Sequence, residues 1–217
     1  MCDELEQRVA AFTAAAKGST NHANVDALAA ELRLRMQTHP QERPRLGGAL
    51  GRLLTTLKAP PPQQLDWLEL GGGRLAIGHR PKLKDLPALR RDGVSHIWTL
   101  LAASEGAATI EAATLSAGLL WIWLPMANGD PPAEDRRHEF SSLFGQVREV
   151  LAAGGSVYLH CAAGIHRTGM IAFALLRYLG QAHDTALGSL LKLRAITANG
   201  VGERRLTWGD PFGGAPA

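Results

Sequence analysis

The stretch "SVYLHCAAGIHRTGMIAF", residues 156–173, joins a short β-rich run to a long apolar run through a loop of small residues. The branched and aromatic side chains before His160 favour a strand. The residues after Thr168 are apolar nearly all round, which is typical of a buried helix. We therefore predict a strand that ends at His160, a tight loop over residues 161–167 and a helix that begins near Thr168.

This loop is suited to binding an anion. At a junction between a strand and a helix, backbone N–H groups converge at the positive end of the helix dipole. The alanines and the glycine of the loop are small enough to let the backbone curl closely around a bound group. The predicted substrate-binding residues are Ala162, Ala163, Gly164, Ile165, His166 and Arg167.

Cys161 lies at the start of this loop. Donors that hold an anion also stabilise a thiolate, so the pKa of Cys161 should be depressed and its sulfur should act as a nucleophile. Arg167 can hold two oxygens of the bound group with its planar guanidinium, and Thr168 can donate its hydroxyl to the departing sulfur. A phosphate monoester is the substrate that this combination favours.

The segment "HCAAGIHRTG", residues 160–169, resembles the signature of the cysteine-dependent protein tyrosine and dual-specificity phosphatases. In that signature, histidine and cysteine are followed after five residues by arginine, then by serine or threonine, then by glycine. The candidate domain, residues 65–210, is short and is most similar to the small dual-specificity type.

The resemblance implies a role for each residue of the motif. Cys161 would form a phosphocysteine intermediate, and Arg167 would bind phosphate and stabilise the transition state. His160 would orient the loop, and Thr168 would help the thiolate to leave. The family's reaction requires neither a metal ion nor a cofactor.

The family also places an aspartate, the general acid, on a mobile loop about thirty residues before the nucleophile. The segment "WIWLPMANGDPP", residues 121–132, occupies this place, and Asp130 is its only aspartate, 31 residues before the cysteine. The closest match to the family's proline-x-x-aspartate pattern puts Asn128 in the acid position, where an amide cannot usefully donate a proton. We assign the role to Asp130. Two further carboxylates remain as alternatives, Glu134 and Asp135.

Short β-rich runs alternate with helical patterns along residues 65–210, which predicts an α/β fold. We expect a central, mostly parallel sheet flanked by helices, as in the phosphatases. The expected elements are a hairpin in residues 67–80, buried strands at 94–101 and 119–126, helices at 107–117 and 133–153, and a last helix that continues through Ile196. Residues 197–206 are either a loop over the site or an ordinary connector, and the tail 210–217 is expected to be loose.

Residues 1–60 form a different region. Their apolar side chains recur at helical spacing, which predicts two or three helices. The segment "APPPQQ", residues 59–64, interrupts helix formation and is interpreted as a linker. We therefore expect a helical N-terminal appendage over residues 1–60, followed by the catalytic domain.

The composition of the chain limits the cellular location and the binding partners that we expect. The 217 residues carry a formal net charge of +3, which suits an anionic ligand and is too small to indicate nucleic-acid binding. The two cysteines, Cys2 and Cys161, do not make a disulfide framework. We find no secretory signal and no apolar run long enough to span a bilayer. A cytoplasmic protein acting on a phosphorylated protein or small molecule is expected, and the oligomeric state is not indicated.

Other functions remain open at this point. The substrate could be an inositol phosphate, a nucleotide or an RNA phosphate end. The same loop could serve a catalytically weak phosphate-binding module, or a rhodanese-like sulfur carrier, which the Arg-Thr-Gly closure disfavours. His166 is either an exposed variable position or a donor to a second phosphate. Histidine there is similar to phosphatases of inositol pyrophosphates, whose loops also carry a lysine that this loop lacks.

Overall fold

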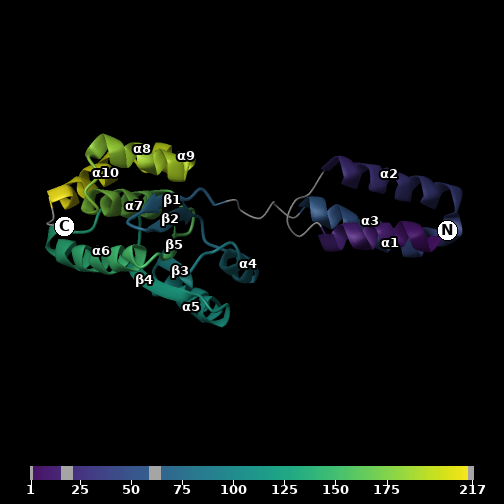
Figure 1. Ribbon diagram of the computed structural model, residues 1–217, viewed down its shortest axis with the longest axis horizontal. Coiled ribbons are helices and arrows are strands. Elements are labelled where there is room, and N and C mark those ends of the chain that lie inside the picture. The colour runs from purple at the N-terminus through teal and green to yellow at the C-terminus, as the bar shows by residue number, and fades with distance from the viewer. Residues whose placement is uncertain (1, 16–21, 59–64, 215–217) are drawn as a thin grey trace. The chain divides into compact units, whose positions relative to one another are not determined.

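The computed structural model describes residues 2–15, 22–58 and 65–214 of the chain (Figure 1). The chain divides into two compact units, Met1–Gln64 and Leu65–Ala217. The predicted linker, residues 59–64, lies outside the described residues.

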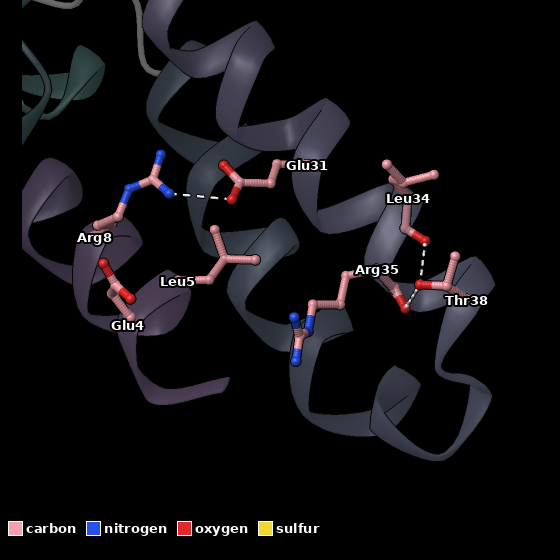
Figure 2. Close-up of a pocket in the computed structure, with 7 residues that line it drawn as sticks. All are labelled: Glu4, Leu5, Arg8, Glu31, Leu34, Arg35 and Thr38. Atoms are coloured by element: carbon pink, nitrogen blue, oxygen red, sulfur yellow. Dashed lines mark hydrogen bonds and ion pairs between the residues drawn. The ribbon is translucent and has the colours of Figure 1, made fainter. Parts of the chain in front are cut away.

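The described part of the first unit is helical and has its own core. Its helices are α1 (Cys2–Ala15), α2 (His22–Thr38), the short η1 (Pro40–Glu42) and α3 (Arg43–Lys58). One buried apolar cluster joins the three α-helices: Leu5, Val9, Leu28, Ala29, Leu32, Leu46, Ala49 and Leu53. Figure 2 shows a pocket of about 350 Å³ at the surface of α1 and α2, where Arg8 forms an ion pair with Glu31 at 3.1 Å.

The second unit is built on a five-stranded sheet. Its strands are β1 (Leu68–Leu70), β2 (Gly73–Gly78), β3 (His96–Leu101), β4 (Leu120–Met126) and β5 (Ser156–His160). Their order is β1-β2-β5-β3-β4. The β1–β2 hairpin is antiparallel, and the other three pairings are parallel. The predicted α/β fold with a mostly parallel sheet is confirmed.

Helices cover both faces of this sheet (Figure 1). They are η2 (Leu83–Asp85), α4 (Leu86–Arg91), η3 (Ala103–Glu105), α5 (Ala107–Ser116), η4 (Glu134–Arg136), α6 (Arg137–Ala152), α7 (His166–Tyr178), α8 (His183–Leu193), α9 (Ala195–Gly200), α10 (Glu203–Gly209) and η5 (Asp210–Gly214). Side chains alternate along each strand. Tyr158 faces the core shared with α4 and α5, whereas Val157 and Leu159 face the larger core with α6, α7, α8 and α10.

The central helix of the larger core is α7. Every residue from Arg167 to Leu176 is buried, as the apolar sequence of this segment predicts. The helix begins at His166, two residues before the predicted start. Among the described helices, including α7, none combines the length and the apolarity needed to cross a membrane.

Three expectations about single segments are corrected. The run at 119–126 was expected to be a buried strand, but β4 lies at the sheet edge, where Leu120 is 58% exposed and Trp123 is 40% exposed. The expected helix through Ile196 is broken at Arg194, whose backbone is extended between α8 and α9. The tail is not loose over its described part, because Phe212 of η5 is buried against Phe144 and Trp208.

The four parallel strands all end at the same edge of the sheet, where ligands bind in open α/β folds. The segments that follow them carry the chemically important side chains. They are His79 and Arg80 after β2, Glu105 after β3, Asn128 to Asp130 after β4, and Cys161 after β5.

Because each unit has a separate buried cluster, we expect the second unit to fold without the first. A fragment of residues 63–217 should unfold in one cooperative transition with the midpoint that this unit shows in the full chain. In the full chain, Leu32→Ala should cost the first unit about 2–5 kcal/mol and leave that midpoint unchanged. Calorimetry measures the transitions of the fragment and of the full chain. An insoluble fragment would show that the N-terminal helices belong to the core of the second unit.

Candidate active site

The predicted loop after β5 is a tight turn that only glycine can close. Gly164 has a φ of +71°, and a Cβ atom there would lie 2.3 Å from the carbonyl oxygen of Gly78. The loop therefore presses directly against the end of β2, and Ile165 precedes the first turn of α7. This arrangement puts Cys161 at the N-terminal end of a buried helix, where the dipole favours a negative charge.

Residues outside the loop hold its carbonyl oxygens. The Arg80 N–H donates to the Ala162 oxygen at 3.0 Å. The Gly164 oxygen accepts from the Thr197 hydroxyl at 2.6 Å and from the Arg194 guanidinium at 2.9 Å. Arg194 lies at the break between α8 and α9. The Gly164 carbonyl is thus bound from outside the loop, while the Gly164 N–H points to the Cys161 sulfur.

Cys161 is buried and only 3% of the residue is exposed. Burial by itself would raise its pKa, but several contacts outweigh burial and lower the pKa of Cys161 below its ordinary value. They are the Thr168 hydroxyl, the N–H groups of Thr168 and Gly164, and the charge of Arg167. The Gly164 N–H lies 3.2 Å from the sulfur. The Thr168 hydroxyl is buried and has no other hydrogen-bond partner among the described residues, so it is available to the sulfur.

Arg167 is held by a residue that sequence analysis did not select, Glu105 of η3. The carboxylate accepts two hydrogen bonds, from Nη1 at 2.5 Å and from Nη2 at 2.8 Å. The Met126 carbonyl also accepts from Nη1, at 2.8 Å. This contact occupies the Nη1–Nη2 edge of the guanidinium. Glu105 does not use the edge formed by Nε and the other Nη2 hydrogen.

The pair also sets the charge state of Glu105. The hydrogen bonds from Arg167 lower the pKa of the Glu105 carboxyl, and a backbone N–H from Ala102 adds to this against the opposing effect of burial. Arg80 holds the same segment, because its guanidinium donates to the Glu105 carbonyl at 2.9 Å. The sequence signal for Glu105 is its position four residues after the end of a strand, next to Gly106.

His160 is neutral at pH 7, because burial lowers its pKa to about 4. The Cys161 carbonyl, 3.1 Å from Nδ1, can only accept, so Nδ1 carries the proton. Nε2 then accepts from the Thr99 hydroxyl at 2.9 Å, and the Thr99 oxygen accepts from the Trp121 indole at 3.0 Å. This chain of hydrogen bonds fixes the ring that precedes the nucleophile.

The candidate acid, Asp130, lies on a loop that contacts the phosphate loop, residues 161–167. A Cβ atom on Gly129 would lie 3.0 Å from the Cβ of His166, so the two loops are in contact there. Asp130 itself is exposed and forms an ion pair with Arg204, while its N–H donates to the Asn128 side chain at 2.9 Å.

The alternative candidates for the acid, and most of the remaining residues of the phosphate loop, lie at the surface. Glu134 is exposed and pairs with Arg137, and Asp135 is exposed in η4. Within the phosphate loop, His166 is exposed together with both alanines, and Ile165 is half-buried. The loop is therefore open to solvent at His166 and the two alanines.

Comparison with known families gives the same assignment. The family described as "Polymorphic toxin system, DSP-PTPase phosphatase" matches residues 72–181, half of the chain. The chain belongs to this family. It is therefore a cysteine-dependent phosphatase of the protein tyrosine and dual-specificity type, as the motif at residues 160–169 predicted.

Solved phosphatases share the fold of this DSP-PTPase phosphatase. The active form of Tk-PTP is 20% identical, with a TM-score of 0.56 over 67% of this chain and 95% of its own. Kinase associated phosphatase, with its catalytic cysteine changed to serine, is 18% identical, with a TM-score of 0.57 over 69% and 93%. PTPMT1 in complex with PI(5)P is 18% identical, with a TM-score of 0.53 over 67% and 93%. No curated protein matches the chain.

Glu105 should be needed for turnover although it does not face the substrate. Glu105→Gln keeps the shape and one acceptor but loses the charge that orients Arg167. Hydrogen bonds to charged groups are worth about 1.5–3 kcal/mol, so kcat should fall about 10- to 100-fold with a smaller change in KM. Steady-state kinetics on an aryl phosphate measures this. Exposed Glu69 serves as the control, and a Glu105→Gln enzyme with the parent kcat would contradict this role.

Proposed function

We propose that the chain hydrolyses phosphate monoesters through a phosphocysteine formed on Cys161. The observation that carries this assignment is the buried Cys161 thiol with its lowered pKa, at the start of α7 and beside Arg167. In the first step, the sulfur attacks phosphorus while the P–O bond to the leaving group breaks. The Nε–Nη2 edge of Arg167 and the N–H groups of the loop hold the three remaining phosphoryl oxygens.

The general acid in this proposal is Asp130. It gives its proton to the leaving oxygen in the first step. In the second step, water attacks phosphorus, its proton passes to the Asp130 carboxylate and the S–P bond breaks. The Thr168 hydroxyl stabilises the departing thiolate, and inorganic phosphate leaves. The neutral ring of His160 takes no part in proton transfer and holds the Cys161 carbonyl.

The proposed substrate is a phosphorylated protein or small molecule that an open loop can accept. The exposed alanines and His166 leave room for a large group beside the phosphate. A screen across phosphopeptides, nucleotides, inositol phosphates and a phosphoinositide, with Cys161→Ser as the blank, identifies the class. The phosphoinositide is included because PTPMT1 binds PI(5)P. Phosphate binding without turnover of any ester would favour a non-catalytic module, the alternative that the exposed Asp130–Arg204 pair supports.

We also propose that the enzyme acts in the cytoplasm. The reaction requires a reduced thiolate on Cys161, and cytosolic reductants keep thiols in that state. In an oxidising compartment, a cysteine with a lowered pKa is readily converted to a sulfenic acid or a disulfide. The proposed mechanism therefore suits a reducing environment.

The lowered pKa of Cys161 predicts selective alkylation at mildly acidic pH. Iodoacetate reacts with the thiolate, so it should modify Cys161 at pH 6–7 much faster than Cys2. As pH rises, the rate at Cys161 should level off earlier than the rate at an ordinary thiol, because its thiolate forms at lower pH. Thr168→Val should move this profile to higher pH. Mass spectrometry reads out both sites, and equal rates at pH 6 would show that Cys161 is not activated.

Asp130 should matter most for esters with a basic leaving group. A positioned acid contributes about 10²- to 10⁴-fold when the leaving oxygen needs a proton. Asp130→Ala should therefore slow phosphotyrosine hydrolysis far more than hydrolysis of a strongly activated aryl phosphate. Asp66→Ala removes an exposed carboxylate before β1 and serves as the control, which should leave both rates unchanged. If both esters slow equally in Asp130→Ala, the acid is another group, with Glu134 and Asp135 next to be tested.

A further inference from the structure

The loop that carries Asp130 is held by α10, a helix beyond the residues that the family match covers. The Arg205 Nε donates to the carbonyl oxygen of Gly129, the residue before the candidate acid. We propose that Arg205 is a positioning residue, which sets the distance between the loop of Asp130 and the phosphate loop. This inference rests on the proposed function, because it takes Asp130 as the general acid.

The Arg205 guanidinium is itself fixed in place. Its Nη1 donates to the Val201 carbonyl at 2.9 Å, one turn earlier in the chain. Gly202, with a φ of +82°, lies beside the guanidinium, since a Cβ atom there would be in van der Waals contact with Nη1 at 3.4 Å. The side chain is half-buried. Arg205 thus makes two hydrogen bonds, one to the Val201 carbonyl and one to the loop that carries Asp130 (the acid loop).

The base of this contact is part of the core behind the phosphate loop. Val201 is completely buried, and a Cβ atom on Gly169 of α7 would lie 2.9 Å from its side chain. A Cβ atom on Gly200 would lie 2.7 Å from the side chain of Ile165. The connection between α9 and α10 therefore packs on the start of α7. The bond from Arg205 therefore connects the acid loop to the same packed segment that supports the loop of Cys161.

The acid loop is enclosed at Gly129. A Cβ atom there would lie 3.0 Å from the Cβ of His166 on one side and 3.4 Å from the Arg205 Nη2 on another. The glycine backbone thus fits between the first residue of α7 and the guanidinium. Loss of the guanidinium would free the loop to move away from the phosphate loop, and Asp130 would move with it.

The neighbouring Arg204 makes a different contact. It pairs with the Asp130 carboxylate, and the two side chains are 68% and 61% exposed. Such an exposed ion pair is weak and is screened by salt. A carboxylate held in an ion pair donates no proton, so this pair must open before Asp130 acts. The bond from Arg205 to the Gly129 backbone does not depend on the charge of Asp130 and can persist through the reaction.

Kinetics with two esters test the role of Arg205. Phenyl phosphate has a basic leaving group and 2,4-dinitrophenyl phosphate an acidic one. If Arg205 positions the acid, Arg205→Ala should lower kcat on phenyl phosphate by about tenfold, a part of the full contribution of a general acid. The kcat on the dinitrophenyl ester and both KM values should stay within about twofold. Arg205→Lys keeps the charge but cannot make both bonds, so it should resemble Arg205→Ala.

Three controls separate positioning from a general loss of structure. The rate of Cys161 alkylation should be unchanged in both Arg205 variants, because the phosphate loop itself is intact. Arg91→Ala removes an exposed positive charge from α4 and should behave as the parent enzyme. In the double variant Arg205→Ala/Asp130→Ala, kcat on phenyl phosphate should equal that of Asp130→Ala alone, because there is no acid left to position.

The outcomes distinguish the two proposals. Two results would overturn the role of Arg205 if Asp130→Ala remains selective for the leaving group. One is an equal loss of kcat on both esters in Arg205→Ala, and the other is a further loss of kcat in the double variant. If Asp130→Ala is itself unselective, the acid assignment fails and the positioning role fails with it. If Cys161→Ser retains activity, the proposed mechanism fails at the nucleophile.

Discussion

The bidentate ion pair between Arg167 and Glu105 is the interaction on which the site depends. It joins the first turn of α7 to the segment after β3 across the carboxyl edge of the sheet. A buried guanidinium without a partner would be costly, because the charge has lost its water. Glu105 replaces that water on one edge of the group, and in the proposed mechanism the other edge holds the phosphate oxygens. The same contact stabilises the junction and orients the guanidinium.

The charges of the site are arranged around this pair. Glu105 is negative, but Arg167 lies between it and the thiol and lowers the pKa of Cys161 together with the Thr168 and Gly164 donors, against the effect of burial. His160 adds no positive charge, because burial keeps it neutral at pH 7. In the proposed mechanism, the attraction for a phosphate dianion therefore comes from the Arg167 guanidinium, the loop's N–H groups and the α7 dipole, with no contribution from His160. These groups are fixed before substrate arrives, as electrostatic catalysis requires.

The C-terminal helices support the loop from outside. Arg194 and Thr197 hold the Gly164 carbonyl, and Val201 packs against Gly169 behind the nucleophile. Arg205 then extends from this support to the loop after β4. All of α8, α9 and α10 lie beyond the span that the family match covers. This part of the chain therefore shapes a site whose proposed reactive residues all lie within the matched span.

By itself, the sequence determined what is local. The strand, loop and helix around Cys161, and the α/β class of the second unit, follow from side-chain pattern and spacing over a few residues. Tertiary structure alone decided the partners, because these contacts join distant segments. Glu105 lies 62 residues from Arg167, and Gly129 lies 76 residues from Arg205. The edge position of β4 likewise depends on the order of strands in the sheet, and no spacing within "LLWIWLPM" reveals it. The proposed nucleophile and its loop are therefore predictable from one segment, whereas the groups that orient them come together only when separate segments of the chain pack at one edge of the sheet.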